Sequence, residues 1–261
     1  MELHRRIANQ LVKRHSKLSR FLPRGYHAYR TAGGWILLDV RESPMMLARV
    51  LRVYEPAKVR AVQAAMGPGK TFIDVGGNKG DFSLIAAKAS GDNGRVVCVE
   101  PEPTNVEWIE RSVKRNKYAS VRVVAAALSD SEGEATLHLG AKSGWHTLVD
   151  DPNHRAGGGD VTVQTRTLDA LLAELGIDRV DAIKIDVEGA EDRVLAGGQH
   201  TFGGSAPMTV FLDLHPPRVD PVALCRQLEA WGFELRDPED PSRPLPGGPH
   251  MGLKEVVACK R

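Results

Sequence analysis

The segment TFIDVGGNKGDFSLIAAKAS, residues 71–90, constrains the fold more than any other part of the chain. A short apolar run ends in an acid, Asp74, glycines follow, and a helical pattern begins at about Asp81. A strand, a glycine loop and a helix in this order are typical of the first unit of a parallel α/β sheet. There the glycines let the backbone approach a ligand closely, and the start of the helix offers unpaired N–H groups. We therefore expect a binding site at this loop.

Apolar strands and helices alternate along the rest of the chain. Strands are predicted over residues 35–40, 72–75, 95–100, 121–127, 182–187, 209–214 and 255–259, and helices over 57–66, 82–89, 106–115, 168–175 and 222–231. Residues 135–139 and 161–166 are predicted to form a hairpin, and 150–159 and 237–249 to form surface loops. This alternation predicts a doubly wound, mostly parallel sheet with helices on both faces. We expect residues 1–66 to form an N-terminal extension and residues 67–261 the main domain.

Composition excludes several classes of protein. Lys plus Arg number 35 and Asp plus Glu 33, so the overall charge does not indicate a partner. The three cysteines, Cys98, Cys225 and Cys259, are far apart, with no Cys-x-x-Cys pair and no histidine cluster at metal-ligand spacing. We expect a reduced, cytoplasmic protein without structural zinc. The longest apolar runs are only a few residues, which excludes a transmembrane helix and the apolar core of a signal peptide.

The charge is concentrated at the N-terminus. Residues 1–30 hold eight Lys or Arg against one acid, a net charge of +7. Leucines and an isoleucine recur there at helical spacing, at Leu3, Ile7, Leu11, Leu18 and Leu22, and predict an amphipathic basic helix. The helix either packs its apolar stripe on the main domain, forms a lid near an acceptor site, or contacts anionic lipid at a membrane surface or nucleic acid.

Two acids at strand ends indicate the ligand. A dehydrogenase normally places its first glycine directly after the strand to bind pyrophosphate, whereas here Asp74 comes first, in the pattern Asp-x-Gly-x-Asn-x-Gly. An acid at that position suits a ligand that carries a cation. Glu100 ends the next strand, VVCVE, where a carboxylate can accept hydrogen bonds from both ribose hydroxyls. A cationic amino-acid end and a ribose describe S-adenosylmethionine. The predicted contacts are Asp74, Gly76, Asn78, Gly80 and Glu100.

Three segments, FIDVGGNKGDFSL, CVEPEPTN and AIKIDVEGAE, resemble the signature segments of the FkbM-like family of class I S-adenosylmethionine-dependent methyltransferases. The resemblance runs from about Met45 to Leu214. One departure is GGNKG, where the family more often has Ala as the second residue. The resemblance implies a seven-stranded, Rossmann-like methyltransferase sheet. It also implies methylation of a hydroxyl on a sugar, glycolipid or secondary metabolite, and it places Asp186 near the methyl donor.

Methyl transfer to a hydroxyl needs alignment, exclusion of water and help with the proton. Strand alternation puts Lys184 and Asp186 on one side of IKIDV, and Asp213 and His215 on one side of TVFLDLHPP. We predict Asp186 and His215 as catalytic residues, with His215 as the base and Asp213 orienting its ring or stabilising its protonated form. Asp186 otherwise contacts the donor, or forms an ion pair with Lys184 that supports the strand end.

Alternatives remain open at this point. His146, in SGWHTL, is a second candidate base, with Trp145 as a platform for a sugar ring. Asp186, Glu188 and Asp213 offer oxygen ligands, but without evident metal-ligand spacing, so we expect no metal. Two other functions compete: an RNA methyltransferase that uses the basic N-terminal segment, and a nucleotide-binding scaffold that has lost catalysis. Motifs typical of RNA methyltransferases are not evident, and Asp74, Glu100 and Asp186 are all in place.

Overall fold

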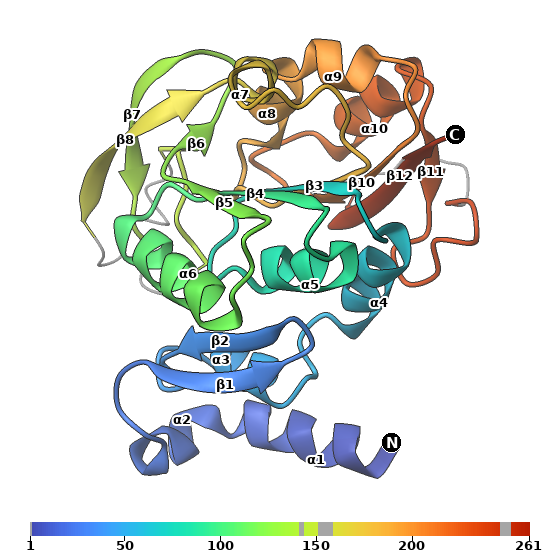
Figure 1. Ribbon diagram of the computed structural model, residues 1–261. Coiled ribbons are helices and arrows are strands. Elements are labelled where there is room, and N and C mark those ends of the chain that lie inside the picture. Colours follow the sequence, from blue (N-terminus) through green and yellow to red (C-terminus); the bar gives the residue numbers. More distant parts are fainter. Residues whose placement is uncertain (1, 141–143, 151–158, 246–251) are drawn as a thin grey trace.

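The structure, a computed structural model, describes residues 2–140, 144–150, 159–245 and 252–261. Its centre is a seven-stranded sheet in the order β11-β12-β10-β9-β3-β4-β5 (Figure 1). The strands are β3 Thr71–Val75, β4 Arg95–Val99, β5 Val121–Val124, β9 Ala182–Ile185, β10 Met208–Asp213, β11 Glu234–Arg236 and β12 Glu255–Lys260. The five strands from β10 to β5 run parallel, and β12 is antiparallel to both its neighbours. The predicted mostly parallel, seven-stranded sheet is confirmed.

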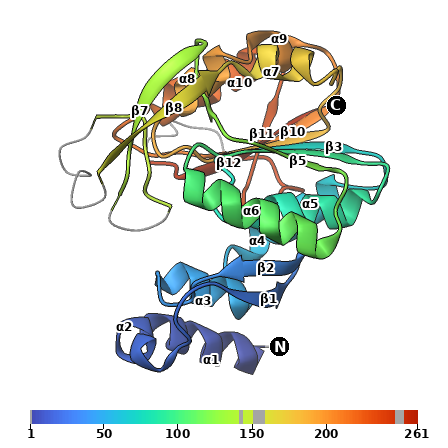
Figure 2. The same ribbon diagram turned by 60° about the vertical axis from the view of Figure 1, so that its left-hand side comes forward.

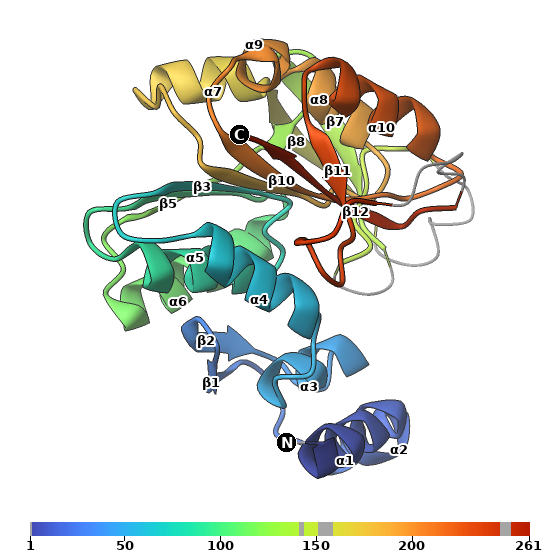
Figure 3. The ribbon, with the colours of Figure 1, turned by 90° about the vertical axis from the view of Figure 1, so that its right-hand side faces the viewer.

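Helices cover both faces of this sheet (Figure 3). One face carries α4 Pro56–Ala65, α5 Asp81–Ser90 and α6 Pro103–Asn116, and the other carries α7 Leu168–Glu174, α8 Glu191–Ala196, α9 Gln199–Gly203 and α10 Pro221–Ala230. Successive strand residues alternate between two buried clusters: Phe72 packs with Phe82 of α5, whereas Ile73 packs with Leu171 of α7. Both faces are therefore buried, which is why the strands read as continuous apolar runs.

A second, three-stranded sheet lies beside the helices of the second face. It consists of β6 Ala127–Leu128, β7 Gly133–His138 and β8 Asp160–Arg166, and the antiparallel pair β7–β8 confirms the predicted hairpin. The single strand predicted over 121–127 was wrong. The chain leaves the main sheet after Val124, and Ala127 pairs instead with Thr165 of β8. The apolar run continues across this bend, from the partly buried valines of β5 to the buried Ala126, Ala127 and Leu128, so hydrophobicity alone does not mark it.

The N-terminal residues form a separate layer beneath α5 and α6 (Figures 1 and 2). Its elements are α1 Glu2–Lys13, α2 His15–Leu18, a 3-10 turn Ser19–Phe21, β1 His27–Thr31, β2 Gly34–Leu38 and α3 Pro44–Val50. Ile36 and Met46 pack against Leu84 of α5. The β1–β2 turn touches the backbone of α5: a Cβ on Gly33 would lie 2.6 Å from the amide nitrogen of Ile85, so only glycine fits there.

The N-terminal helix is present, but its buried face differs from the predicted stripe. Ala8 and His15 are buried, and the His15 ring bonds the carbonyl oxygen of Val40 at 2.8 Å. Ile7 and Leu11, which belong to the predicted stripe, remain 52% and 38% exposed. A small residue and a satisfied histidine thus make the contact that the larger apolar residues were expected to make.

Some predictions about organisation remain open. The boundary between residues 66 and 67 stays a prediction, and Val62 and Met66 pack in the same cluster as Phe72. Most of the predicted loop 150–159, and the end of 237–249, lie outside the described residues. Among the described residues, no helix is long and apolar enough to cross a membrane.

Candidate active site

The loop after β3 passes directly against the loop after β9. Gly76 has φ +74°, and a Cβ at this position would lie 1.9 Å from the carbonyl oxygen of Asp186. The amide of Gly76 also donates to the carbonyl of Val99 at 2.9 Å, which ties the loop to β4. Any side chain at residue 76 would separate the two loops. Glycine here therefore brings the carboxyl ends of three neighbouring strands together.

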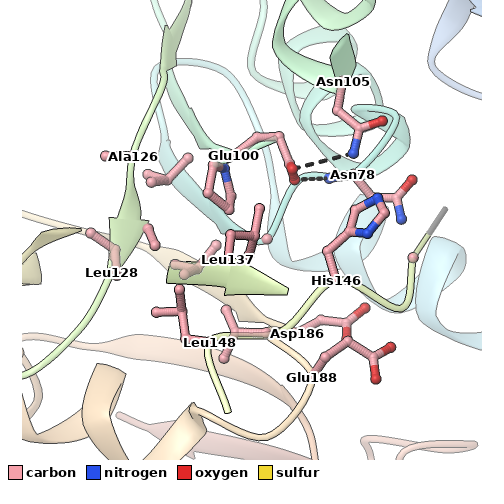
Figure 4. Close-up of a pocket in the computed structure, with 17 residues that line it drawn as sticks. Asn78, Glu100, Asn105, Ala126, Leu128, Leu137, His146, Leu148, Asp186 and Glu188 are labelled. Carbon is pink, nitrogen blue, oxygen red and sulfur yellow. Dashed lines mark hydrogen bonds between the residues drawn. The ribbon is translucent and has the colours of Figure 1, made fainter. Parts of the chain in front are cut away.

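A cavity of about 590 Å³, open to solvent at its mouth, lies at these strand ends (Figure 4). One wall is apolar and includes Val99, Ala126, Leu128, Leu137 and Leu148. The other is polar and includes Asn78, Glu100, His146, Asp186 and Glu188. We call this the donor cavity. Its place beyond the carboxyl ends of parallel strands is the usual ligand position in such sheets, and its apolar wall suits a planar nucleobase.

Glu100 is buried in the polar wall, and its carboxylate is held from several sides. One oxygen accepts from the amide of Asn78 at 2.7 Å, and the other accepts from the amide of Glu102 at 3.0 Å and from the side chain of Asn105 at 3.2 Å. Burial nevertheless raises the pKa of Glu100 to about 7. The carboxylate is thus fixed in orientation and retains room to accept from a ligand hydroxyl at the cavity.

Asp74 and Gly80 lie behind the loop rather than on the cavity wall. Oδ2 of Asp74 accepts from the amide of Ser83 at 2.9 Å and from its hydroxyl at 2.7 Å, and Oδ1 lies 3.7 Å from Nζ of Lys184. Gly80, at φ +82°, begins α5. Of the predicted donor contacts, the cavity wall includes Gly76, Asn78, Glu100 and Asp186, whereas Asp74 and Gly80 order the loop from below. Direct contact of these two residues with the donor stays a prediction.

Lys79 connects the donor cavity to the N-terminal layer. Its buried ammonium group lies 3.2 Å from a carboxylate oxygen of Glu42 and donates to Oδ1 of Asn105 at 2.9 Å. The same Asn105 amide donates to Glu100. Tyr26 of the layer lies 3.4 Å from the ammonium group and stacks on Trp108 of α6 with ring centroids 3.9 Å apart. The sequence contains these residues, but nothing in their spacing indicated that they form one chain of contacts to Glu100.

A second cavity adjoins the first, and we call it the acceptor cavity. The two share Asn78, Gly144, Asp186 and Glu188. The rest of the wall includes residues from distant parts of the chain: Met45 and Arg49 of α3, Tyr54 and Glu55 before α4, Trp145, and His215 after β10. Asp186 and Glu188 therefore lie where a donor in one cavity and an acceptor in the other would meet.

His215 is oriented toward this junction by a buried glutamate. Nδ1 of His215 lies 2.8 Å from Oε1 of Glu191, which is fully buried and also accepts from the amide of Gly189 at 3.0 Å. A carboxylate accepts only, so Nδ1 carries the hydrogen and the lone pair of the neutral ring is on Nε2. Nε2 lies 3.8 Å from Asp186 and 3.6 Å from Glu188. Burial alone would lower the pKa of His215. The carboxylates of Glu191, Glu188 and Asp186 outweigh this effect and raise the pKa of His215 to about 9.

Asp213 was predicted to orient the His215 ring, and this was wrong. The Asp213 carboxylate is held by Lys58 at 2.7 and 2.8 Å. Glu191 takes the predicted role, because the turn after β9 folds back onto the end of β10. Glu191 is present in the motif AIKIDVEGAE, but its distance of 24 residues from His215 gave no signal of contact.

The remaining charged groups of the junction are paired. Nζ of Lys184 lies 3.3 Å from Asp186, so the predicted ion pair is present. Burial alone would raise the pKa of Asp186, but the ammonium groups of Lys184 and Lys58 hold it below its usual value. Glu188 has φ +56°, and its carbonyl accepts from Thr147 at 2.7 Å; burial raises its pKa to about 7. Asp186 is thus the more acidic of the two carboxyl groups, Asp186 and Glu188.

His146 and Trp145 belong to different cavities. The ring of His146 lies in the donor cavity near Asn78, and its Nδ1 accepts from the amide of Gly140 at 3.2 Å (Figure 4). Burial lowers its pKa. Trp145 lines the acceptor cavity and is 42% exposed. This placement favours His215 over His146 as a base and suits Trp145 to stacking on an acceptor ring.

A divalent cation has a conceivable position here. Asp186, Glu188 and His215 each place one ligand atom within 4.8 Å of the others. However, Lys184 lies beside Asp186, and Nη1 of Arg218 lies 3.6 Å from Glu188. These positive charges oppose a cation at the same place. The expected absence of metal stays a prediction, which the chelator control described in the Discussion tests.

Comparison with known proteins identifies the family. The sequence profile described as the methyltransferase FkbM domain matches residues 74–235, more than half of the chain. The chain belongs to the FkbM methyltransferase family. It is therefore an S-adenosylmethionine-dependent methyltransferase, and S-adenosylmethionine is its methyl donor.

Several known proteins are similar to this chain over part of its length. The 2-O-methyltransferase NoeI of Sinorhizobium fredii is 26% identical over 182 residues, which cover 57% of this chain and 72% of NoeI. The AMB antimetabolite synthetase AmbE of Pseudomonas aeruginosa is 29% identical, covering 62% of this chain and 10% of AmbE. Methyltransferase sdnD of Sordaria araneosa is 29% identical, covering 50% and 61%. This chain thus spans less than two thirds of the last two proteins.

Among solved structures, an FkbM methyltransferase from Methylobacillus flagellatus is similar with a TM-score of 0.48 and 12% identity. The match covers 96% of this chain and 59% of that one.

The contacts of Lys79 lead to a prediction about this FkbM methyltransferase. Lys79→Met removes the donor that fixes the Asn105 amide, so Asn105 no longer holds Glu100 in one orientation. We expect the dissociation constant for S-adenosylmethionine, measured by calorimetry, to rise about fivefold, the effect of about one hydrogen bond. Lys88→Met is the control: Lys88 is exposed and also contacts the N-terminal layer, through the carbonyl of Ala32, but does not contact Asn105. Equal effects of the two substitutions would contradict the proposed link to Glu100.

Proposed function

We propose that this chain is an O-methyltransferase whose acceptor is a hydroxyl of a sugar, glycolipid or secondary metabolite. The observation that carries the proposal is the buried Glu191–His215 pair, which directs Nε2 of His215 to the junction of the two cavities. A hydroxyl is a poor nucleophile, so a base at this point is the group that oxygen methylation needs. The exposed ring of Trp145 supports a ring-shaped acceptor. The name of NoeI, a 2-O-methyltransferase, is consistent with oxygen as the methylated atom.

The residues of the two cavities suggest how the reaction proceeds. The apolar wall and Glu100 suit the adenosine part of S-adenosylmethionine, which supplies an electrophilic methyl group on a sulfonium. His215 removes the acceptor's hydroxyl proton as the oxygen bonds to the methyl carbon. The bond from that carbon to sulfur breaks, and sulfur keeps the electron pair. The products are a methyl ether, S-adenosylhomocysteine and protonated His215, whose partly exposed ring returns the proton to solvent.

The ionised carboxylate of Asp186 lies beside Nε2 and stabilises the imidazolium that forms at His215. The same carboxylate can accept a hydrogen bond from a second acceptor hydroxyl, as on a sugar ring. Asp186 thus acts in both positioning and charge stabilisation. Glu188 forms part of the wall where the two cavities meet.

Acceptor chemistry can be tested with labelled S-adenosylmethionine and a panel of glycans, glycolipids and hydroxylated metabolites, with mass spectrometry of the products. We expect a methyl ether that resists mild base.

Trp145→Ala should raise the acceptor KM about tenfold without changing donor affinity, because stacking contributes about 1–2 kcal/mol. Trp35→Ala is the control, since Trp35 is similarly exposed (37%) but lies outside both cavities. Methyl groups found on nitrogen, carbon or RNA, or no transfer despite donor binding, would refute the proposal.

A further inference from the structure

The outermost layer of the molecule is basic. We define the basic layer as residues 6–24, which comprise most of α1, α2, the 3-10 turn and the segment that follows (Figures 1 and 3). Its exposed cationic side chains are Arg6, Lys13, Arg14, Lys17, Arg20 and Arg24. Residues 1–30 carry +7, which leaves −5 for residues 31–261 out of the overall +2. The molecule is therefore strongly polarised, with its positive end on the layer farthest from the sheet.

The same layer exposes large apolar side chains. Phe21 is 73% exposed, Ile7 52% and Leu11 38%. They are three of the five large exposed apolar residues among the described parts of the chain. The guanidinium of Arg20 lies 4.7 Å above the Phe21 ring, so a cation and an aromatic ring are presented together. The inner face of the helix is already occupied through Ala8 and His15. The exposed parts of Phe21, Ile7 and Leu11 therefore remain accessible to a partner outside the chain.

The basic layer lies close to the acceptor cavity. Helix α1 packs on α3, and α3 contributes Met45 and Arg49 to the cavity wall. A surface that binds the layer would thus lie one helix away from the wall of the acceptor cavity. The donor cavity is formed by the loops of the main sheet, so it does not depend on such contact.

From the charge and these exposed groups, we propose that the basic layer docks on an anionic lipid bilayer. Lys and Arg are attracted to acidic headgroups, while Phe21, Ile7 and Leu11 insert at the boundary with the acyl chains. A nucleic-acid backbone would use the cations but would leave Ile7 and Leu11 in water, so the combination favours lipid. Docking also implies, on the basis of the proposed function, an acceptor carried at a membrane surface, such as the headgroup of a glycolipid.

The experiment is vesicle co-sedimentation of the full chain. We expect binding to vesicles of phosphatidylcholine with about one third phosphatidylglycerol, weak binding to phosphatidylcholine alone, and a loss of binding as salt rises. Combined Lys13→Gln, Lys17→Gln and Arg24→Gln should weaken binding about 10²-fold, from about fivefold for each charge. Phe21→Ala should weaken it about tenfold. The matched control replaces three exposed cations elsewhere, Lys114→Gln, Arg122→Gln and Arg226→Gln.

The possible outcomes are distinct. Donor affinity measured on every variant confirms that each protein is folded and that the donor site is intact. Docking is supported if the layer variants lose binding and the control triple does not. It is overturned if anionic vesicles do not bind, if the control triple loses as much, or if Phe21→Ala has no effect. Salt-sensitive binding of a short RNA that exceeds vesicle binding would also overturn it and indicate nucleic acid. None of these results depends on which acceptor is methylated, so failure of docking leaves the proposed function standing.

Discussion

His215→Ala is expected to lower the rate of methyl transfer by about 10²–10⁴-fold, the usual contribution of a general base. The full effect should appear at about pH 9.5, where the wild-type ring is neutral. At pH 7 the ratio of the wild-type rate to the His215→Ala rate should be about 10²-fold smaller, because a pKa of about 9 leaves roughly one wild-type ring in a hundred unprotonated. Single-turnover measurements with saturating donor would isolate this step. Donor affinity should stay unchanged, since His215 lies outside the donor cavity.

The pH profile tests the assignment independently of the size of the loss. The raised pKa means that the base form predominates only above about pH 9, so the wild-type rate should rise about tenfold per pH unit up to that value. Glu191→Gln removes the carboxylate that holds Nδ1–H, and with it a cause of the raised pKa. The rising limb should therefore move to lower pH in Glu191→Gln and disappear in His215→Ala. A rising limb that stays in His215→Ala would assign the base role to another group, with Asp186 and His146 the first to test.

A chelator control separates this role from metal binding. A cation held by Asp186, Glu188 and His215 would also be lost in His215→Ala, and the rate would fall for a different reason. We expect EDTA to leave the wild-type rate unchanged, and Mg²⁺ or Mn²⁺ not to increase it. Loss of activity in EDTA that is restored by a divalent cation would replace the general-base assignment by a metal-assisted one.

Glu100→Ala is expected to weaken S-adenosylmethionine binding by about 10²–10⁴-fold. Two ribose hydroxyls donating to a carboxylate contribute about 1.5–3 kcal/mol each, and calorimetry measures their loss directly. Glu102→Ala is the control: Glu102 caps α6 through the amides of Thr104 and Asn105 but does not line the donor cavity. It should cost about 1 kcal/mol of stability and leave donor affinity nearly intact. An unchanged affinity in folded Glu100→Ala protein would remove Glu100 from the donor site.

The pKa of Glu100 adds a pH dependence to this prediction. The ribose hydroxyls need the ionised carboxylate, and burial raises its pKa to about 7. Affinity for the donor should therefore improve as pH rises to about 7 and stay level above it, whereas Glu100→Gln should show no such change. The sign for stability is opposite. The folded state holds this proton more tightly than the unfolded chain does, so the contribution of Glu100 to stability falls as pH rises from 4.5 to about 7.

The sequence predicted the sheet well because its strands are buried on both faces. Runs such as Phe72–Val75 have no polar positions that a helix would expose, apart from the acid that marks the strand end. The sequence did not predict five short elements: β1, α3, α8, α9 and β11. Their hydrophobic patterns are weak because they are short, and contacts with the rest of the fold hold them in place. The N-terminal stripe was misjudged because Ala8 and a histidine bonded to a backbone carbonyl fill the interface. Local hydrophobicity cannot anticipate a polar residue that finds its partner only in the fold.

The candidate site shows the same difference between features that follow from local sequence and features that depend on the fold. Gly76, Asn78, Glu100 and Asp186 could be placed from the sequence because each follows a strand end, and strand ends meet at one edge of a parallel sheet. The pairing of His215 with Glu191 could not, because it depends on how two loops fold over that edge. Nor could the use of Asp213 by Lys58, a residue 155 positions earlier in the chain.

The two cavities come from different stretches of the chain, and this has a consequence for how new enzymes arise. Among the described residues, all that line the donor cavity lie between residues 75 and 188, inside the span that the family shares. The acceptor cavity also takes Met45, Arg49, Tyr54 and Glu55, which precede that span. We therefore expect mutation or recombination in this short upstream stretch to alter substrate preference while the methyl-donor site is inherited intact. Chimeras that exchange only residues 45–55 between relatives are the natural starting point for redirecting the enzyme to a new acceptor.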